Sequence, residues 1–294
     1  MQFNLQNPNI MKHLFRTIST LTLVLILSTA NAQSWFNKEK TIGNGDITTQ
    51  SINTSDYDAI HVVGFLDVEI VNGREGEISV TTDSNLHEYI NVEVQDNILV
   101  IKIKEKTKIS TKKGVWVTVP VESISKVHIA GSGNLSSDVT LKANEFKLNV
   151  SGSGNATMVI DASKIESRIA GSGDIELSGS YTELELSIMG SGSFTGSGQS
   201  AKSIEVTIVG SGDVTLSGDT SKLDLRISGS GDFHGFKLNA DQTKVSVIGS
   251  GDAQVVARQN IIARTNGSGN IVYKGNPTHT DLTSNGAGKI RGIR

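Results

Sequence analysis

The chain has 294 residues, with 27 lysines and arginines against 30 aspartates and glutamates, a formal charge of −3. It contains no cysteine, which excludes disulfide frameworks, thiolate zinc sites, iron–sulfur clusters and cysteine nucleophiles. The near-neutral charge argues against a nucleic-acid partner, and the 31 glycines beside only 3 prolines indicate an ordered fold with many tight turns.

The first segment, residues 1–32, is typical of a secretory signal peptide. It has no acidic residue, and Lys12 and Arg16 precede an apolar run over 18–27. The segment ends in Ala30-Asn-Ala32, which fits signal-peptidase cleavage. The apolar run is much shorter than the ~20 residues of a transmembrane helix. We therefore expect export rather than anchoring.

The signal is compatible with a start at either Met1 or Met11, and the mature chain is expected to begin near Gln33. No cysteine follows the apolar run, which excludes a lipoprotein anchor, and no later stretch is apolar enough to cross a membrane. The expected location is the periplasm, the outer cell surface or the extracellular space.

Two regions precede the most regular part of the chain. Residues 33–55 are polar and predict a linker whose end joins the first strands. Residues 56–128 alternate apolar and polar positions, which is typical of strands. Six strands are expected, at 60–63, 66–71, 77–81, 90–94, 98–103 and 115–119. We interpret 56–128 as an all-β cap for the repeat array that follows, because the open ends of such arrays need to be covered.

A tetrapeptide recurs through residues 129–294. Eight copies read Gly-Ser-Gly followed by Asp, Asn or Ser, and a ninth reads Gly286-Ala-Gly-Lys289. The copies follow one another at a nearly constant interval, and a fixed period of roughly 20 residues indicates a solenoid. The glycines of the eight copies, predicted to form structural corners, are Gly131, Gly133, Gly152, Gly154, Gly171, Gly173, Gly190, Gly192, Gly210, Gly212, Gly229, Gly231, Gly249, Gly251, Gly267 and Gly269.

The sequence between the copies predicts strands. Apolar and polar residues alternate before each tetrapeptide, as in 184–188 and 204–208, and the residue directly after it is apolar in all nine copies. A second turn, such as Ser178-Gly-Ser180, divides each coil into two short strands. Equivalent strands then stack in parallel, and crossovers between parallel strands are almost always right-handed. The predicted fold class is all-β, a right-handed single-stranded parallel β-helix with coils of ~19 residues.

The tetrapeptide is explained most simply by the chemistry of a corner, because glycine accepts positive φ and Asn or Asp bonds the nearby backbone. A sharper hypothesis is a calcium ladder. Asp213, Asp232 and Asp252 occupy the same corner in three successive coils, with Asp174 two coils before Asp213. Carboxylates ~5 Å apart repel unless they face solvent or hold cations. The nine-residue period of calcium-binding repeats is absent, so calcium is the weaker interpretation, and no other cofactor is expected.

The sequence contains no catalytic motif: it has neither a Gly-x-Ser-x-Gly elbow nor a Walker loop. A polysaccharide lyase or hydrolase needs clustered carboxylates with a basic partner in one groove. Here the acids outside the corners alternate as outward strand residues, and Arg168 and Arg226 are single outward cations at similar coil positions. Aromatic platforms for sugars are scarce, with Phe233, Phe236 and Tyr273 as the nearest cluster.

Four stretches, in this order, resemble a known family: Tyr57–Ile60, Val63–Ile70, Val117–Pro120, and Ile129–Asn134 with the Gly-Ser-Gly-Asp coils after it. Together they are similar to the head GIN domain family of putative auto-transporter adhesins, also called domain of unknown function 2807, over roughly 56–272. The resemblance implies a right-handed β-helix and an exported protein of a Bacteroidetes-like cell envelope. It implies no established activity and no functional residues.

We expect an exported, non-catalytic protein of the cell envelope or surface that acts as an adhesin-like binding or structural module. Its expected partner is a glycan or an envelope or surface protein, and flat exposed β faces favour homo-oligomers. Two alternatives stay open. One is a β-helix polysaccharide lyase or hydrolase, and the other is a periplasmic scaffold or sensor component that binds only protein.

Overall fold

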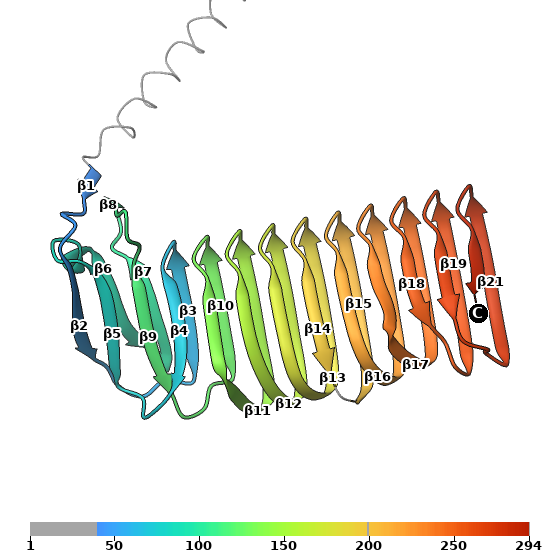
Figure 1. Cartoon of the computed structure of the whole chain (residues 1–294), viewed down its shortest axis with the longest axis horizontal. Coiled ribbons are helices and arrows are strands. Elements are labelled where there is room, and N and C mark those ends of the chain that lie inside the picture. Colours follow the sequence, from blue (N-terminus) through green and yellow to red (C-terminus); the bar gives the residue numbers. More distant parts are fainter. Residues whose placement is uncertain (1–39, 199, 294) are drawn as a thin grey trace, which may run out of the picture. The chain divides into compact units, whose positions relative to one another are not determined.

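The structure is a computed structural model that describes residues 40–198 and 200–293, so the predicted signal peptide over 1–32 lies outside the described residues. The chain divides into two units. The smaller unit contains β1 (Lys40–Ile42) and β8 (Lys108–Ser110), which pair in parallel. The larger unit contains a 20-stranded sheet wound into a β-solenoid of about nine turns (Figure 1). The predicted fold class is confirmed.

The coils after residue 125 are regular. Neighbouring strands are parallel, with register shifts after Ser136 in β11 and after Thr215 in β16, and the first glycines of successive tetrapeptides are aligned. The strands are β10 (Lys126–Gly131), β11 (Leu135–Gly152), β12 (Ala156–Gly171), β13 (Ile175–Gly190), β14 (Phe194–Gly198), β15 (Ala201–Gly210), β16 (Val214–Gly229), β17 (Phe233–Gly249), β18 (Ala253–Val256), β19 (Asn260–Gly267), β20 (Ile271–Lys274), β21 (His279–Gly286) and β22 (Ile290–Ile293).

Several strands run through the second predicted turn without a break. β13 has 16 residues and includes Ser178-Gly-Ser180, where Gly179 has a φ of 127°. Its pairing with β12 continues on both sides of the bend, with Gly179 opposite Ile160. The two short strands predicted for this coil are therefore one long strand with a bend, because the adjacent coil bends at the same place and the hydrogen-bond ladder is kept.

The interior of the coils is filled mainly by alternate residues of their strands, as in β13 and β16. Phe146, Phe194 and Phe233 are the largest side chains that are fully buried. The residue after each corner is buried from Leu135 through Ile271, as the apolar position in the sequence predicts. Burying one of the larger side chains of this column, such as Ile175 or Phe194, contributes about 1.5–3 kcal/mol, whereas Ala156 and Ala253 contribute less to their coils.

The coil array begins earlier than the predicted boundary at residue 129. β3 (Ala59–Gly64) and β4 (Asp67–Asn72) form a coil whose strands pair in parallel with β10 and β11. Its corner reads Gly64-Phe-Leu-Asp67, without the second glycine, so the motif alone does not reveal it. The position of that glycine is taken by Leu66, which is fully buried.

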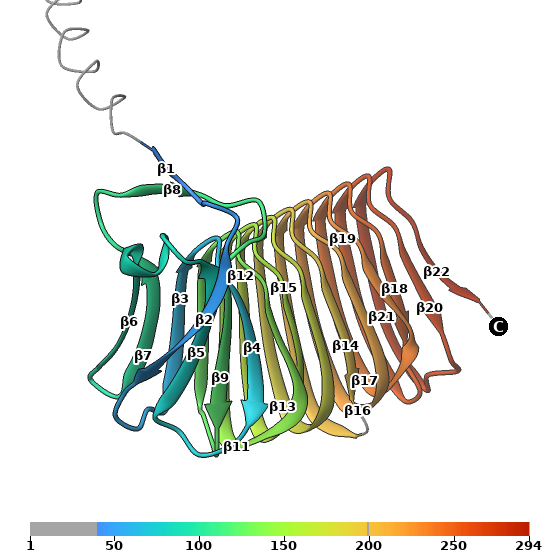
Figure 2. The same ribbon diagram turned by 60° about the vertical axis from the view of Figure 1, so that its left-hand side comes forward.

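The N-terminal end of the array is covered by strands that reverse direction (Figure 2). β7 (Ile98–Ile103) and β9 (Trp116–Val121) pair in parallel with β3 and β4. Antiparallel strands then follow: β6 on β7, β5 on β9, and β2 on β5. Their bounds are β2 (Ile47–Asn53), β5 (Glu77–Asp83) and β6 (Ile90–Gln95), and the 3₁₀ turn η2 (His87–Tyr89) precedes β6.

The linker interpretation of 33–55 is therefore wrong for residues 47–53, which form the whole of β2. All seven residues of this strand are paired with β5, from Ile47 opposite Asp83 to Asn53 opposite Glu77. An outer strand is held through its backbone and needs few apolar side chains, so its polar composition concealed it.

Candidate functional site

The two glycines of each corner are needed for different reasons. The first one, such as Gly152 with a φ of 120°, adopts a backbone conformation that strains residues with a Cβ. The second one lies against the corner of the preceding coil. A Cβ on Gly154 would lie 2.2 Å from the carbonyl oxygen of Gly133, so close stacking, rather than φ, excludes a side chain there.

The fourth residues of the corners form a hydrogen-bonded column. Oδ1 of Asp213 accepts the backbone N–H of Asp232 at 2.9 Å, and Oδ1 of Asp232 accepts that of Asp252 at 2.7 Å. Oδ1 of Asp174 accepts the backbone N–H of Ser193 at 2.8 Å, so Ser193 separates Asp174 from the other three aspartates. The side chains thus extend the backbone ladder past the corner.

Asp67 starts this column, although no sequence motif marks it. Its Oδ1 accepts both the backbone N–H and the side-chain Nδ2–H of Asn134, at 2.9 and 3.0 Å. Among the described residues, no group of three or more His, Cys, Asp or Glu side chains is arranged to hold a metal ion. Hydrogen bonds to the backbone account for the column. The calcium ladder stays a prediction, which melting temperatures measured at increasing calcium concentrations would test.

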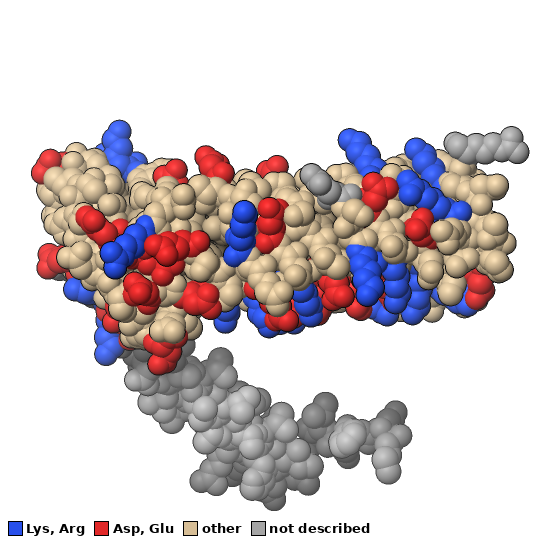
Figure 3. Space-filling model, turned by 90° about the horizontal axis from the view of Figure 1, so that it is seen from below, with Lys and Arg blue, Asp and Glu red and all other residues tan. Residues whose placement is uncertain are grey.

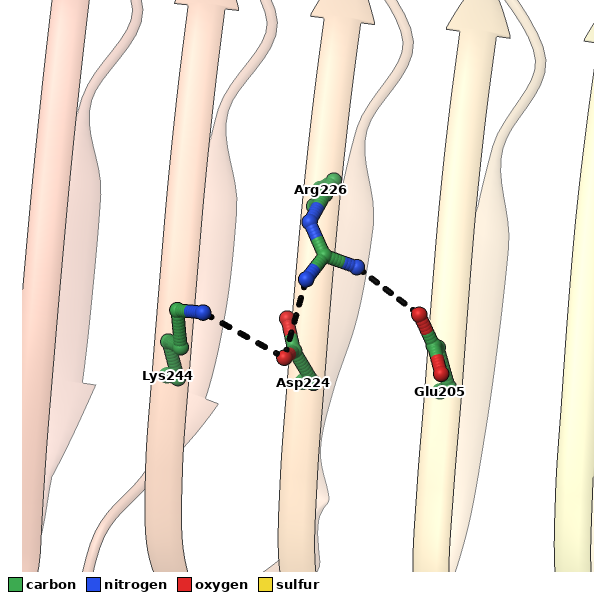
Figure 4. Close-up of polar contacts among 4 residues, drawn as sticks. All are labelled: Glu205, Asp224, Arg226 and Lys244. Carbon is green, nitrogen blue, oxygen red and sulfur yellow. Dashed lines mark hydrogen bonds and ion pairs between the residues drawn. The ribbon is translucent and has the colours of Figure 1, made fainter.

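Outward charges on the strands before the corners form ion pairs between coils (Figure 4). Arg226 contacts Glu205 Oε1 at 2.8 Å and Asp224 Oδ2 at 3.1 Å, and Lys244 Nζ lies 3.6 Å from the same Asp224 oxygen. On the side shown in Figure 3, basic and acidic side chains are interspersed rather than gathered into a band of one sign. The Arg226–Glu205 pair is exposed on both sides, and pairs of this kind are worth ~0–1 kcal/mol each, whereas the side chain of Asp224 is only 15% exposed.

The residues considered for polysaccharide cleavage do not form one site. Glu205 and Asp224 are both paired with Arg226, and Phe233 is fully buried. Phe236 lies under the ammonium of Lys274, 4.4 Å from Nζ to the ring centroid. The three aromatic residues that lie nearest to a cluster in the sequence therefore do not form a sugar-stacking platform, since Phe233 is in the core and Phe236 is covered by a cation.

A groove of about 830 Å³ crosses four successive coils in the C-terminal half. We call it the axial groove, because its lining residues occupy the same positions in β16, β17, β19 and β21. These residues are Lys222, Leu223, Gln242, Thr243, Lys244, Asn260, Ile261, Ile262, Thr278, His279, Thr280 and Asp281.

The axial groove combines a floor of alternating apolar residues and threonines with polar edges. The floor is the column of Leu223, Thr243, Ile261 and Thr280, of which the first three are buried, and the column beside it carries Lys222, Gln242, Asn260 and His279, in register from coil to coil. On the other side of the floor, the side chain of Ile262 is 42% exposed. A row of hydrogen-bonding groups at the strand spacing of ~4.8 Å is suited to a ligand that lies along the solenoid axis.

Sequence reasoning missed the axial groove because its residues lie outside the tetrapeptide and differ in type. The signal that could have located it is positional. Lys222, Gln242, Asn260 and His279 follow their own corners at intervals of similar length, so aligning the coils places them in one column. Among the described residues, no helix has both the length and the apolarity that crossing a membrane requires.

A family model described as "Putative auto-transporter adhesin, head GIN domain" matches residues 56–216 and 180–277. A crystal structure of a putative adhesin from Parabacteroides distasonis is similar, with a TM-score of 0.68 and 27% identity, and one from Parabacteroides merdae has a TM-score of 0.66 and 25% identity. A putative lipid binding protein from Parabacteroides distasonis has a TM-score of 0.65 and 25% identity. Each comparison covers 87% of this chain and 100% of the other. No curated protein matches the sequence.

Proposed function

Because the chain belongs to the head GIN domain family of putative auto-transporter adhesins, we propose that it is an exported, non-catalytic protein of the cell envelope or surface that works as an adhesin-like binding module. The segment over 1–32 supports export, since it has the pattern of a signal peptide. The adhesin names of two similar structures support the binding role.

The axial groove is the observation that carries the proposal. It spans four coils, and its edges repeat hydrogen-bonding side chains such as Gln242 and Asn260 in register. The rigid backbone ladder holds these groups before any ligand arrives, which lowers the entropic cost of binding. The partner that this geometry suits is an extended chain, either a glycan or a strand of an envelope or surface protein.

Catalysis is not part of the proposal. Glu205 and Asp224, two of the outward acids of the strands, are engaged in ion pairs with Arg226, whereas a lyase or hydrolase needs a free acid and base on either side of one bond. A scaffold or sensor role, with protein as the only partner, would use the same rigid surface without a glycan.

The test compares whole-cell adhesion and glycan-array binding of the purified protein with those of two double variants. Gln242→Ala with Asn260→Ala removes two groove side chains, and Thr195→Ala with Thr215→Ala is the matched control on an exposed face outside the groove. We expect the groove variant to lose most of the binding and the control to keep it.

Two results would overturn the proposal. New reducing ends or unsaturated products, released from a panel of plant and bacterial polysaccharides, would favour the enzyme. No binding to cells or glycans by the unmodified protein would favour the protein-only scaffold.

A further inference from the structure

A second pocket, of about 420 Å³, lies near the N-terminal end of the solenoid. It is lined by Asp67, Val68, Glu69, Trp116, Asn134 and Ser136. Trp116 belongs to β9, the carboxylates come from β4, and Asn134 and Ser136 come from the next corner and strand. We call it the tryptophan pocket. It shares no residue with the axial groove.

The strand register places two rows of outward side chains in this pocket. Trp116 is directly opposite Asp67, and Asp67 is hydrogen-bonded to Asn134. In the second row, Glu69 is opposite Ser136. One aromatic ring therefore stands beside two carboxylates, an amide and a hydroxyl, all carried by neighbouring coils of the same sheet.

The indole of Trp116 is held in place although its residue is 56% exposed. Its Nε1–H donates to the carbonyl oxygen of Lys113 at 3.0 Å. The ring also lies close to Gly114, since a Cβ on that residue would be 3.2 Å from Nε1. An exposed aromatic ring that is fixed by a hydrogen bond and a close packing contact is pre-organised for stacking.

The turn that holds the indole is itself anchored in the interior. The hydroxyl of Thr111 donates to Asp83 Oδ2 at 2.6 Å and accepts the backbone N–H of Gly114 at 3.1 Å. Asp83 is 2% exposed and accepts the backbone N–H of Gly45 as well, at 2.6 Å. Its hydrogen bonds with Thr111 and Gly45 lower the pKa of this carboxyl, so the anchor is an ionised group that holds the turn at neutral pH.

The polar groups of the pocket are available to a ligand. Asp67 uses Oδ1 for its contacts with Asn134. Within the described part of the chain, neither Glu69 nor Ser136 has a side-chain hydrogen bond or ion pair. Carboxylate acceptors beside an exposed aromatic face match a sugar ring, which offers C–H groups on one face and hydroxyl donors around its edge.

We propose that the tryptophan pocket binds a pyranose ring that is uncharged or carries an amino group, stacked on Trp116 with its hydroxyl or amino groups donating to Asp67 and Glu69. This assignment rests on the proposed adhesin-like function and names the ligand class as glycan. The two carboxylates also set the specificity. They attract an ammonium group and repel the carboxylate of a uronic acid or a sulfate ester.

The test is isothermal titration of the purified full chain with three disaccharides of similar size: cellobiose, the glucosamine dimer and digalacturonate. We expect the glucosamine dimer to bind more tightly than cellobiose, and digalacturonate to bind at least tenfold more weakly than either. Trp116→Ala should weaken cellobiose binding on the order of tenfold, in line with one lost aromatic stack, and Trp116→Phe should restore most of it.

Two further variants test whether weaker binding by Trp116→Ala comes from the pocket rather than from a folding defect. Met189→Ala removes another exposed apolar side chain, 52% exposed and far along the array, and should leave all three affinities unchanged. Glu69→Lys reverses one charge at an exposed position and should invert the preference, so that digalacturonate binds better than the glucosamine dimer.

The proposal is overturned if none of the three sugars binds, or if Trp116→Ala and Glu69→Lys leave the affinities unchanged while the melting temperature is normal. Whole-cell adhesion separates the two claims. Adhesion by an unmodified protein that binds none of the three sugars refutes the pocket but keeps the adhesin-like function. Sugar binding by an unmodified protein that adheres to no cell keeps the pocket and refutes that function.

Discussion

The two ends of the solenoid differ in how far the apolar core is separated from water. At the N-terminal end, β2, β5 and β6 reverse direction and cover the coils that follow. At the C-terminal end, all eight residues of β21 are exposed and Leu282 is 41% exposed. A solenoid end therefore needs either a cover or an interior that tolerates water.

At the C-terminal end, which we call the open end, the inward residues before the corners are more polar than in the earlier coils. The last inward position before each corner is Ile or Val in the earlier coils but Thr265 and Ser284 in the last two. The Thr265 hydroxyl donates to the carbonyl oxygen of Gly269 at 2.7 Å, and that of Ser284 to Gly288 at 2.6 Å. These bonds satisfy polar groups inside the corner, so the terminal coil has less apolar surface to lose to water.

The largest expected difference in the loss of stability between the middle and the open end of the array is at the corner glycines. A Cβ on Gly212 would lie 2.2 Å from the Gly192 carbonyl oxygen, and one on Gly288 would lie 2.1 Å from that of Gly269. Gly212→Ala has coils on both sides and should cost on the order of 3 kcal/mol or more. Gly288→Ala should cost far less, because the last coil can move away. Chemical denaturation measures both, and equal losses would show that the end is as rigid as the middle.

The next largest effect on stability is expected when a buried core residue and an inward residue of the open end are each replaced by alanine. Phe194 is 1% exposed, whereas Leu282 is an inward residue of the open end. Phe194→Ala should lower the free energy of unfolding by about 3–5 kcal/mol. Leu282→Ala should lower it by less than ~1 kcal/mol, since much of that side chain already contacts water. A loss for Leu282→Ala as large as the loss for Phe194→Ala would mean that another molecule covers this end.

The stability of the protein is expected to depend on pH through a pair of histidines near the covered N-terminal end. His61 and His128 stack with ring centroids 4.5 Å apart. Burial, and then the charges of His128 and Lys126, lower the pKa of His61; burial and Lys126 lower that of His128. Because the unfolded chain binds protons more readily, stability should be complete above pH ~6.5 and fall as the pH drops toward the lowered pKa values.

The double variant His61→Gln with His128→Gln should remove this dependence, and melting temperatures between pH 5 and 8 measure it. A matched substitution of His234, which lies on β17, should leave the pH profile as it is. The same profile in both variants would locate the titrating groups elsewhere.

The smallest effect is expected for the ion pair on the last coil. Arg264 Nη2 lies 2.6 Å from Asp281 Oδ2, and this contact lowers the pKa of Asp281. Arg264→Ala should leave the melting temperature nearly unchanged, because the pair is exposed and screened by salt. It should speed hydrogen exchange in β21 at low salt only. Faster exchange at the covered end would contradict a purely local effect.

How much of the structure the sequence predicts differs between the regular coils and the N-terminal end of the array. The sequence predicts the regular coils because each one repeats the same glycine corner and the same apolar position after it, as at Leu135 and Ile175. It does not reveal the coil of β3 and β4, since Leu66 replaces the second glycine where the strands on the other side, β7 and β9, form no glycine corner. β2 resembles a linker in sequence because an outer strand does not require an apolar face.

The sequence by itself determined the winding, since a period of about 19 residues with glycine at the corners and alternating strands leaves few ways to bury the apolar side chains. Only the tertiary structure decided where binding groups meet. Trp116 and Glu69 are far apart in the chain, yet they line one pocket because β9 and β4 are neighbours. Local periodicity encodes strands and turns, whereas a pocket depends on which strands become adjacent.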